Sequence, residues 1–185
     1  ARIGLRRSDG VRTISAYTSR VVREAGAQPT ATFAAFMDLE PFLEQEPVPL
    51  PKRPVALFVG VLERYKGVDV LADAWRLAAP RVPEATLHLV GRGTLRDVPE
   101  RLVAELPDQT RWTEAMVTPQ LARALDEATI LVLPSRSEGL GRVVIEAFCR
   151  ARGVVASRVG GIPDLVTDEE TGLLVAPEDP PALAD

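Results

Sequence analysis

The sequence has a single cysteine, Cys149, among its 185 residues. One cysteine excludes an intrachain disulfide, and a chain that does without disulfides is typical of a reducing compartment. Cys149 lies between Phe148 and Arg150 in a stretch with helical spacing, where a cysteine more often fills a core than acts as a nucleophile. The cysteine content therefore favours a cytoplasmic location and does not point to thiol chemistry.

Metal-binding side chains are equally scarce. The chain has one histidine, His88, and no two aspartates with the spacing Asp-x-Asp. Zinc sites draw on several cysteines and histidines, and calcium and magnesium sites draw on clustered carboxylates. His88 stands inside the apolar run Thr86–Leu89, where a buried, hydrogen-bonded imidazole is the expected state. We predict no metal site and no cofactor.

Long apolar runs and a large net charge are also lacking. No apolar run approaches the roughly 18 residues of a membrane-spanning helix, and no signal-peptide pattern opens the chain. The net charge of −4 gives no overall electrostatic case for nucleic acid binding. The opening segment is nevertheless rich in arginine, and such a patch either faces solvent, the commoner case, or contacts acidic lipid at a membrane surface or a neighbouring domain. These arginines are Arg2, Arg6, Arg7, Arg12, Arg20 and Arg23.

The residue pattern from about Pro54 onward predicts an α/β fold. Short apolar runs alternate with amphipathic stretches, as in the strand-helix units of a parallel sheet. The runs are almost continuously apolar, which is expected of strands that are covered on both faces. We predict an open, doubly wound parallel sheet with strands over Val55–Val59, Thr86–Val90, Thr110–Thr113, Ile130–Leu133, Val154–Ser157 and Gly172–Val175.

Three helices are predicted between these strands. Val68–Ala79 places its apolar residues on one helical face. Pro119–Ala128 begins after Thr118, a good N-cap residue, with proline at the first helical position. Apolar residues also recur at helical spacing in Gly141–Arg152.

The first 53 residues do not follow this rhythm. Arg12–Ile14, then Ser15 and a helix to about Gly26, read as one strand-helix unit without sheet partners, and five prolines in Pro41–Pro54 mark an extended linker. Glu178–Asp185 opens one more helix. We predict a remnant of another domain with its linker over residues 1–53 and a domain over residues 54–185, and we interpret the chain as a fragment of a longer protein.

The loops after the first two strands contain candidate ligand-binding residues, because ligands of open α/β sheets bind outside the carboxyl ends of the strands. After the first strand, Gly60 and Gly67 enclose the cations Arg64 and Lys66, which suits a diphosphate. A solvated loop is the alternative. After the second strand, Gly91-Arg92-Gly93 allows the backbone to approach a ligand closely, although a plain tight turn accounts for it equally well.

The loop after the fourth strand is the most distinctive. It runs from Pro134 to Arg142 and leads into a predicted helix. Gly139 and Gly141 leave the backbone N–H groups at the helix start uncovered, where they and the helix dipole can receive phosphate oxygens.

Two carboxylates accompany this loop, Glu138 before the helix and Glu146 on its second turn. Carboxylates only accept hydrogen bonds, so they suit sugar or ribose hydroxyls better than phosphate. The alternatives are that the helix dipole merely stabilises Glu138 while Glu146 is an exposed helix residue, or that the two form the acid and base of a glycosidase. The surrounding glycines favour anion binding over the glycosidase.

The order of these motifs resembles the C-terminal domain of the family 4 retaining glycosyltransferases, whose GT-B fold consists of two facing Rossmann-like domains. The resemblance runs from Val55 to Pro177, about two thirds of the chain. It implies a three-layer αβα architecture. The motifs that carry it are Pro134-Ser135-Arg136-Ser137-Glu138-Gly139 with Glu146, Val59-Gly60 with Tyr65-Lys66-Gly67-Val68-Asp69, Val90-Gly91-Arg92-Gly93, Gly160-Gly161-Ile162-Pro163-Asp164-Leu165-Val166 and Thr171-Gly172-Leu173-Leu174-Val175.

The resemblance also implies a reaction, the transfer of a hexosyl group from a UDP- or GDP-sugar with retention of configuration and without a metal. Glu138 would hold hydroxyls of the donor sugar, Glu146 would accept hydrogen bonds from the ribose, and Lys66 would neutralise the diphosphate. Glu138 and Lys66 are the expected catalytic residues. The expected donor-binding residues are Gly60, Arg64, Lys66, Gly91, Gly93, Ser135, Glu138, Gly139, Leu140, Gly141 and Glu146.

The acceptor would be bound by the N-terminal domain of the same chain, so this fragment alone is expected to be inactive. Val61 stands where the family usually has arginine, with Arg64 three residues on, and Leu140 stands where an aromatic residue is common. Ala151 and Gly153 replace the usual glycine and proline. Two alternatives stay open, a non-catalytic nucleotide-sugar-binding or regulatory module and a related enzyme such as a sugar-nucleotide epimerase. The base and the acceptor are not specified by the sequence.

Overall fold

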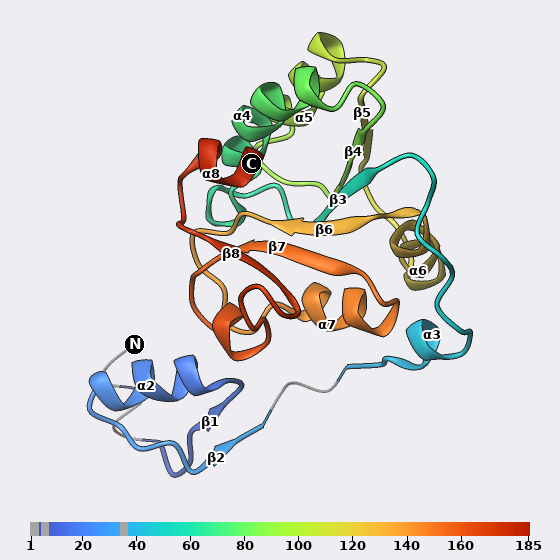
Figure 1. Ribbon diagram of the computed structural model, residues 1–185. Helices are drawn as coiled ribbons and strands as arrows, with labels where there is room; N and C mark the ends of the chain where they lie inside the picture. Colours follow the sequence, from blue (N-terminus) through green and yellow to red (C-terminus); the bar gives the residue numbers. More distant parts are fainter. Residues whose placement is uncertain (1–3, 5–7, 34–36) are drawn as a thin grey trace.

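A six-stranded parallel sheet forms the centre of the protein in the computed structural model, which describes Gly4, residues 8–33 and residues 37–185 (Figure 1). The strand order is β5-β4-β3-β6-β7-β8, and each neighbouring pair is parallel. The chain lays down β3 first, adds β4 and β5 on one side, and then returns to add the other three strands. The strands are β3 (Val55–Val59), β4 (Thr86–Val90), β5 (Thr110–Thr113), β6 (Ile130–Leu133), β7 (Gly153–Ser157) and β8 (Gly172–Val175).

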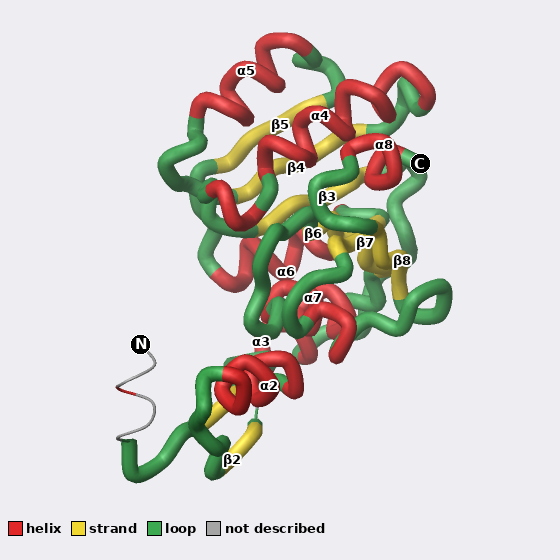
Figure 2. The backbone as a smooth tube through the Cα atoms, turned by 90° about the vertical axis from the view of Figure 1, so that its left-hand side faces the viewer, coloured by secondary structure: helices red, strands yellow, loops and turns green. Residues whose placement is uncertain are grey.

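Helices cover both faces of this sheet (Figure 2). On one face, α4 (Val68–Ala78), α5 (Asp97–Glu105) and α8 (Pro180–Ala184) enclose a core that contains Phe58. On the other face, α6 (Thr118–Glu127) and α7 (Arg142–Cys149) enclose a second core that contains Leu57. Neighbouring strand residues point to opposite faces, which is why two adjacent apolar residues serve two cores. The predicted open, doubly wound αβα architecture is confirmed.

Five of the six predicted strands match residue for residue, and β7 begins one residue early. The predicted helix starts and ends are less accurate. The N-cap of α6 is Val117 and not Thr118, and α7 spans fewer residues than predicted because Gly141 is its N-cap and its last turn closes at Cys149. Helix α5 was not expected from the sequence.

The amino-terminal unit consists of β1 (Arg12–Thr13), α2 (Ala16–Glu24) and β2 (Ala31–Thr32). The prediction that its strand lacks sheet partners is wrong, because β1 pairs with β2 in parallel. Its interior is polar, since the Thr13 hydroxyl lies 2.7 Å from that of Ser19 and 2.8 Å from that of Thr32. Of the arginines noted in this segment, Arg2, Arg6 and Arg7 lie outside the described residues.

Part of the segment predicted to be an extended linker instead packs on the sheet domain. Helix α3 (Glu40–Leu43) accommodates a proline in its first turn and buries Phe42 against α6 and α7. The side chains of two arginines, Arg150 and Arg152, hold the backbone of α3 and of the segment after it, and each of these arginines is only 2% exposed. Arg150 donates to the carbonyls of residues 42, 45 and 46 and makes two hydrogen bonds with Asp126, and Arg152 donates to the carbonyl of Val48.

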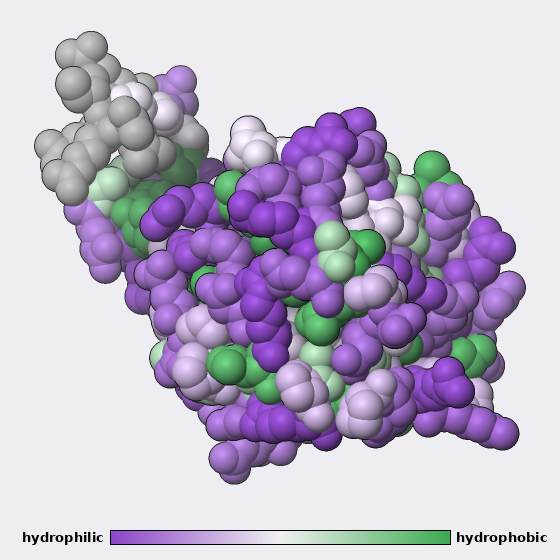
Figure 3. All heavy atoms as spheres, turned by 90° about the horizontal axis from the view of Figure 1, so that it is seen from above, coloured by the Kyte–Doolittle hydropathy of each residue, from purple (hydrophilic) through white to green (hydrophobic). Residues whose placement is uncertain are grey.

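The surface around this framework is mixed. Seen from above, hydrophilic residues dominate, and hydrophobic residues appear only as scattered spots (Figure 3). This face of the molecule therefore presents no broad apolar surface among the described residues.

Candidate functional site

A pocket of about 570 Å³ lies at the carboxyl ends of β3 and β6. The chain reverses its direction of growth between these two strands, and open α/β sheets bind ligands at such a switch point. The volume falls within the usual range for small-molecule sites. The predicted site residues that line the pocket are Gly60, Lys66, Glu138, Gly139, Leu140, Gly141 and Glu146.

Lys66 and Glu138 form an ion pair in this pocket. The Lys66 ammonium donates to Oε2 of Glu138, and the two side chains are only 16% and 14% exposed. Lys66 comes from the 3₁₀ turn η1 (Arg64–Lys66), and Glu138 comes from the loop before α7. Partial burial makes such a pair stronger than a solvent-exposed one, because solvent screens it less. The pocket thus combines a cation with an acceptor-only carboxylate.

Glu146 lies on the second turn of α7 and is 8% exposed, so the alternative of an exposed helix residue is wrong. Burial raises the pKa of Glu146 above its ordinary value, and the charge of Arg142, 3.6 Å away, acts in the opposite direction. A raised pKa means that the folded state disfavours the carboxylate, so Glu146 costs stability as the pH rises through the pKa of the unfolded chain. A buried carboxylate that lowers the stability of the folded state and lines a pocket is a candidate for a functional residue.

The start of α7 forms the floor of the pocket. Gly141 caps the helix with φ of 87°, and a Cβ atom there would lie 2.5 Å from Cδ1 of Ile162. Both constraints require glycine. The first N–H groups of an α-helix have no partner inside the helix, and they carry its partial positive charge. The eight-residue helix α7 therefore directs donors and positive potential toward the pocket.

The remaining predicted site residues do not line the pocket. Arg64 is exposed, and Ser135 is fully buried, with a hydroxyl that has no hydrogen-bond partner among the described residues. Gly91 and Gly93 have a packing role, because a Cβ at either position would lie 1.8 Å or 2.5 Å from a carbonyl oxygen of the loop after β3. Their contact with a ligand stays a prediction.

The pocket lining also includes residues that were not among the predicted site residues, and Arg142 and Ile14 are the most informative of them. Arg142, the first residue of α7, lines the pocket and supplies a cation that Val61, also on the lining, does not. Ile14 reaches the lining from the amino-terminal unit. Arg142 was identifiable as the residue after the helix-capping glycine, but no local signal brings Ile14 to a loop so distant in sequence.

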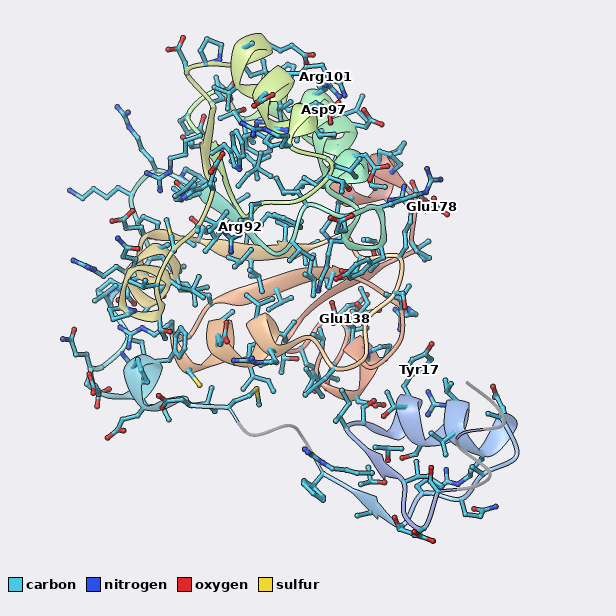
Figure 4. All side chains as sticks on the ribbon, turned by 180° about the vertical axis from the view of Figure 1, so that it is seen from behind. Tyr17, Arg92, Asp97, Arg101, Glu138 and Glu178 are labelled. Atoms are coloured by element: carbon cyan, nitrogen blue, oxygen red, sulfur yellow. The ribbon has the colours of Figure 1, made fainter. Side chains whose placement is uncertain are left out.

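The amino-terminal unit contacts the same loop directly. The Ser15 hydroxyl donates to the carbonyl of Gly139 at 2.8 Å, and the N–H of Tyr17 donates to the Asp164 carboxylate at 3.2 Å. Tyr17 lies at the start of α2, and Glu138 lies in the loop before α7 (Figure 4). Residues Gly139–Gly141, which we call the glycine loop, are thus held between the amino-terminal unit and the sheet domain.

The single histidine is buried inside the sheet domain. His88 is 4% exposed, and its Nε2 lies 3.0 Å from the Thr113 hydroxyl, which confirms the expected buried, hydrogen-bonded imidazole. Within the described ranges, no group of three or more potential ligand residues forms a metal site. Among the same residues, no helix is both long and apolar enough to cross a bilayer.

The sequence matches known proteins over most of its length. Residues 53–185 match the model of a protein family described as glycosyl transferases group 1. The alpha-maltose-1-phosphate synthase of Mycobacterium tuberculosis is 42% identical over 135 residues, which cover 68% of this chain and 34% of that protein. The chain spans only a quarter to about a third of the length of curated relatives such as this one.

Solved structures share the fold of nearly the whole chain. The sucrose-phosphate synthase of Thermosynechococcus elongatus matches with a TM-score of 0.83 and 33% identity, over 99% of this chain and 49% of that one. The Anabaena protein HepE, solved in complex with UDP-glucose, matches with a TM-score of 0.81 and 21% identity, over 99% of this chain and 55% of that one.

Proposed function

The chain belongs to the glycosyl transferases group 1 family, and we propose on this premise that its pocket binds the nucleoside diphosphate of a UDP- or GDP-sugar. In this proposal the chain is the donor-binding part of a retaining, metal-independent glycosyltransferase. The observation that carries the proposal is the grouping of Lys66, Glu138 and Glu146 around the start of α7 at the switch point of the sheet. The UDP-glucose in the HepE structure, which has the same fold, supports it.

Each group has a distinct task in the proposed reaction. Lys66 and the first N–H groups of α7 stabilise the negative charge that develops on the leaving diphosphate. Glu138 accepts hydrogen bonds from hydroxyls of the sugar, and Glu146 accepts them from the ribose. Because these donors and carboxylates already line one pocket, little reorganisation is needed to bring them to the donor.

The proposal assigns the acceptor to a domain that this chain does not contain. Among the described residues outside the sheet domain, Ile14 lines the pocket and Ser15 donates to the carbonyl of Gly139, and both belong to the amino-terminal unit. We expect the chain to bind nucleotide and to transfer no sugar by itself. Turnover by the isolated chain would contradict this part of the proposal.

Calorimetric titration with UDP and GDP tests the proposal. We expect one nucleotide to bind in the micromolar to millimolar range and Glu146→Ala to abolish most of that binding, because the ribose loses its acceptor. Glu170→Ala is the matched control, since Glu170 is exposed and does not line the pocket. If neither nucleotide binds, or if both variants behave alike, the pocket is not a nucleotide site.

The alternative of a non-catalytic binding module is favoured by one residue, Val61. It is 44% exposed at the pocket, where the family usually places an arginine. Val61→Arg separates the two functions. In an active donor site the added cation tightens binding modestly, because Lys66 and Arg142 already supply positive charge, whereas in a decayed site it creates binding where none was measurable.

A further inference from the structure

Arg136 has no role in the site as described so far, but it connects the loop after β3 with the loop after β6. Its guanidinium makes two hydrogen bonds with the Asp69 carboxylate, at 2.8 and 2.9 Å, and two more with the carbonyl of Arg64 at 2.7 Å and the carboxylate of Glu178 at 2.8 Å. Its side chain is only 18% exposed. A planar guanidinium that is bidentate to one carboxylate fixes direction as well as distance.

Contacts with residues 134 and 136 hold the chain on both sides of Lys66. The carbonyl of Arg64 accepts from the Arg136 side chain, and the carbonyl of Tyr65 accepts from the Arg136 backbone N–H at 2.8 Å. On the other side of Lys66, Gly67 adopts φ of 69° and packs so closely that a Cβ would lie 2.0 Å from the carbonyl oxygen of Pro134. The backbone that carries Lys66 is therefore held against residues 134 and 136 at two positions before the lysine and at one position after it.

The same residue limits the freedom of Glu138, which follows it by two positions. Beyond Glu138, the chain is fixed again, because the carbonyl of Glu138 accepts from the N–H of Gly161 at 2.9 Å and lies 1.8 Å from where a Cβ of Gly160 would be. Arg136 and the two glycines thus anchor the loop on either side of the carboxylate. Neither Arg136 nor Asp69 lines the pocket.

We infer that Arg136 is a positioning residue, which holds Lys66 opposite Glu138 and so sets the phosphate-binding cation of the site. The inference rests on the proposed function for its consequence, but its structural part does not require a ligand. Asp69 is its main anchor, because the bidentate pair sits where η1 meets α4. Glu178 is 60% exposed and is a minor anchor, as exposed ion pairs contribute little.

Lysine reactivity tests the structural part without any nucleotide. The chain has two lysines, Lys66 and the exposed Lys52, so acylation by an amine-reactive ester can be read at both sites in one molecule by mass spectrometry. We expect Arg136→Gln and the isosteric Asp69→Asn to raise the acylation of Lys66 relative to Lys52 several-fold. Glu178→Gln, which removes only the exposed partner, should leave the ratio unchanged.

Two results with the variants of the buried pair would overturn the inference at this stage. One is an unchanged ratio in Arg136→Gln while its circular dichroism remains that of the parent. The other is an unchanged ratio in Asp69→Asn, which keeps the test decisive if Arg136→Gln does not fold. An equal rise in Glu178→Gln would also contradict it, because general loosening of the surface and not the buried pair would then control Lys66.

A double-mutant cycle tests the functional part by titration with UDP and GDP. Arg136→Gln should weaken binding about tenfold in the parent chain and have almost no effect when Lys66→Met is already present, since the arginine acts through the lysine. Equal losses in both backgrounds would refute the positioning role. If the parent chain binds neither nucleotide, the proposed function fails, and the reactivity ratio alone decides the inference.

Discussion

Ala151 occupies a backbone conformation that suits glycine, and we predict that Ala151→Gly stabilises the protein. The residue has φ of 51° and follows the end of α7. Its N–H donates to the carbonyl of Phe148 and that of Arg152 donates to the carbonyl of Ala147, both at 3.0 Å. This pair of bonds is the Schellman motif, in which glycine is usual at the left-handed position. The structure thus gives a physical cost to the alanine at this position.

The magnitude follows from two opposing terms. A left-handed conformation costs an L-residue about 1–2 kcal/mol, and Ala151→Gly removes this cost. The substitution also lowers the stability by about 0.5–1 kcal/mol, because glycine makes the unfolded chain more flexible. Ala151 is exposed, so its methyl group contributes little packing. We expect a net gain of about 0.5–1 kcal/mol in the free energy of unfolding, which raises the melting temperature by about 1–4 °C in a chain of this size.

Chemical and thermal unfolding measure this change, and the chain offers a reverse control. Helix α2 ends in the same motif with Gly26 at φ of 82°, where the N–H of Gly26 donates to Arg23 and that of Ala27 donates to Val22. Gly26→Ala should therefore weaken α2 by a similar amount, read as lost amide protection in that helix. A neutral or destabilising Ala151→Gly would refute the reasoning, because no strain would then be stored at that position.

Three further predictions concern charged groups. Burial, together with the nearby charge of Arg111, lowers the pKa of His88 to about 4. Between pH 6.5 and pH 4 the imidazole is therefore protonated in the unfolded chain and neutral in the folded one. Stability should fall as the pH drops from 6.5 toward 4, and the imidazole proton signal of this single histidine should not shift above pH 5. Arg142→Ala should weaken nucleotide binding more than Arg64→Ala does in parallel titrations, since only the former residue lines the pocket. Asp126→Ala should cost about 3 kcal/mol in urea unfolding because it leaves the buried Arg150 without its carboxylate, and an unchanged midpoint would contradict this.

The sheet was predictable from sequence because most of its strands are almost continuous apolar runs, as expected of strands that are covered on both faces. The edge strand β5, Thr-Arg-Trp-Thr, is the exception. The helices were harder to predict. Helix α5 carries Pro99 in its first turn, where proline is tolerated because that N–H has no partner inside the helix, but where the residue also reads as a breaker. Helix α3 was missed for the same reason, since the prolines around it indicate extended chain.

The candidate site was predictable where one loop carries it and not where two loops meet. The residues from Glu138 to Gly141 follow from the family motif and the glycines. The closeness of Lys66 to Glu138 depends on Arg136, whose contacts span 67 positions to Asp69. The glycines after β4 were assigned to a ligand, whereas Gly91 packs on the backbone of the loop after β3. The spacing of two glycines indicates that another group approaches the backbone closely, but it does not show whether that group is a ligand or another segment of the chain.

The contact of Ser15 with Gly139 joins two units that lie 124 positions apart in the sequence, and it makes their association an equilibrium that a ligand can shift. By thermodynamic linkage, a ligand that contacts both Ile14 and the glycine loop strengthens their association by the same free energy that the association adds to its binding. For such a ligand, substitutions that only loosen α2 should lower its affinity without touching it, and tight binding should stabilise a weakened amino-terminal unit.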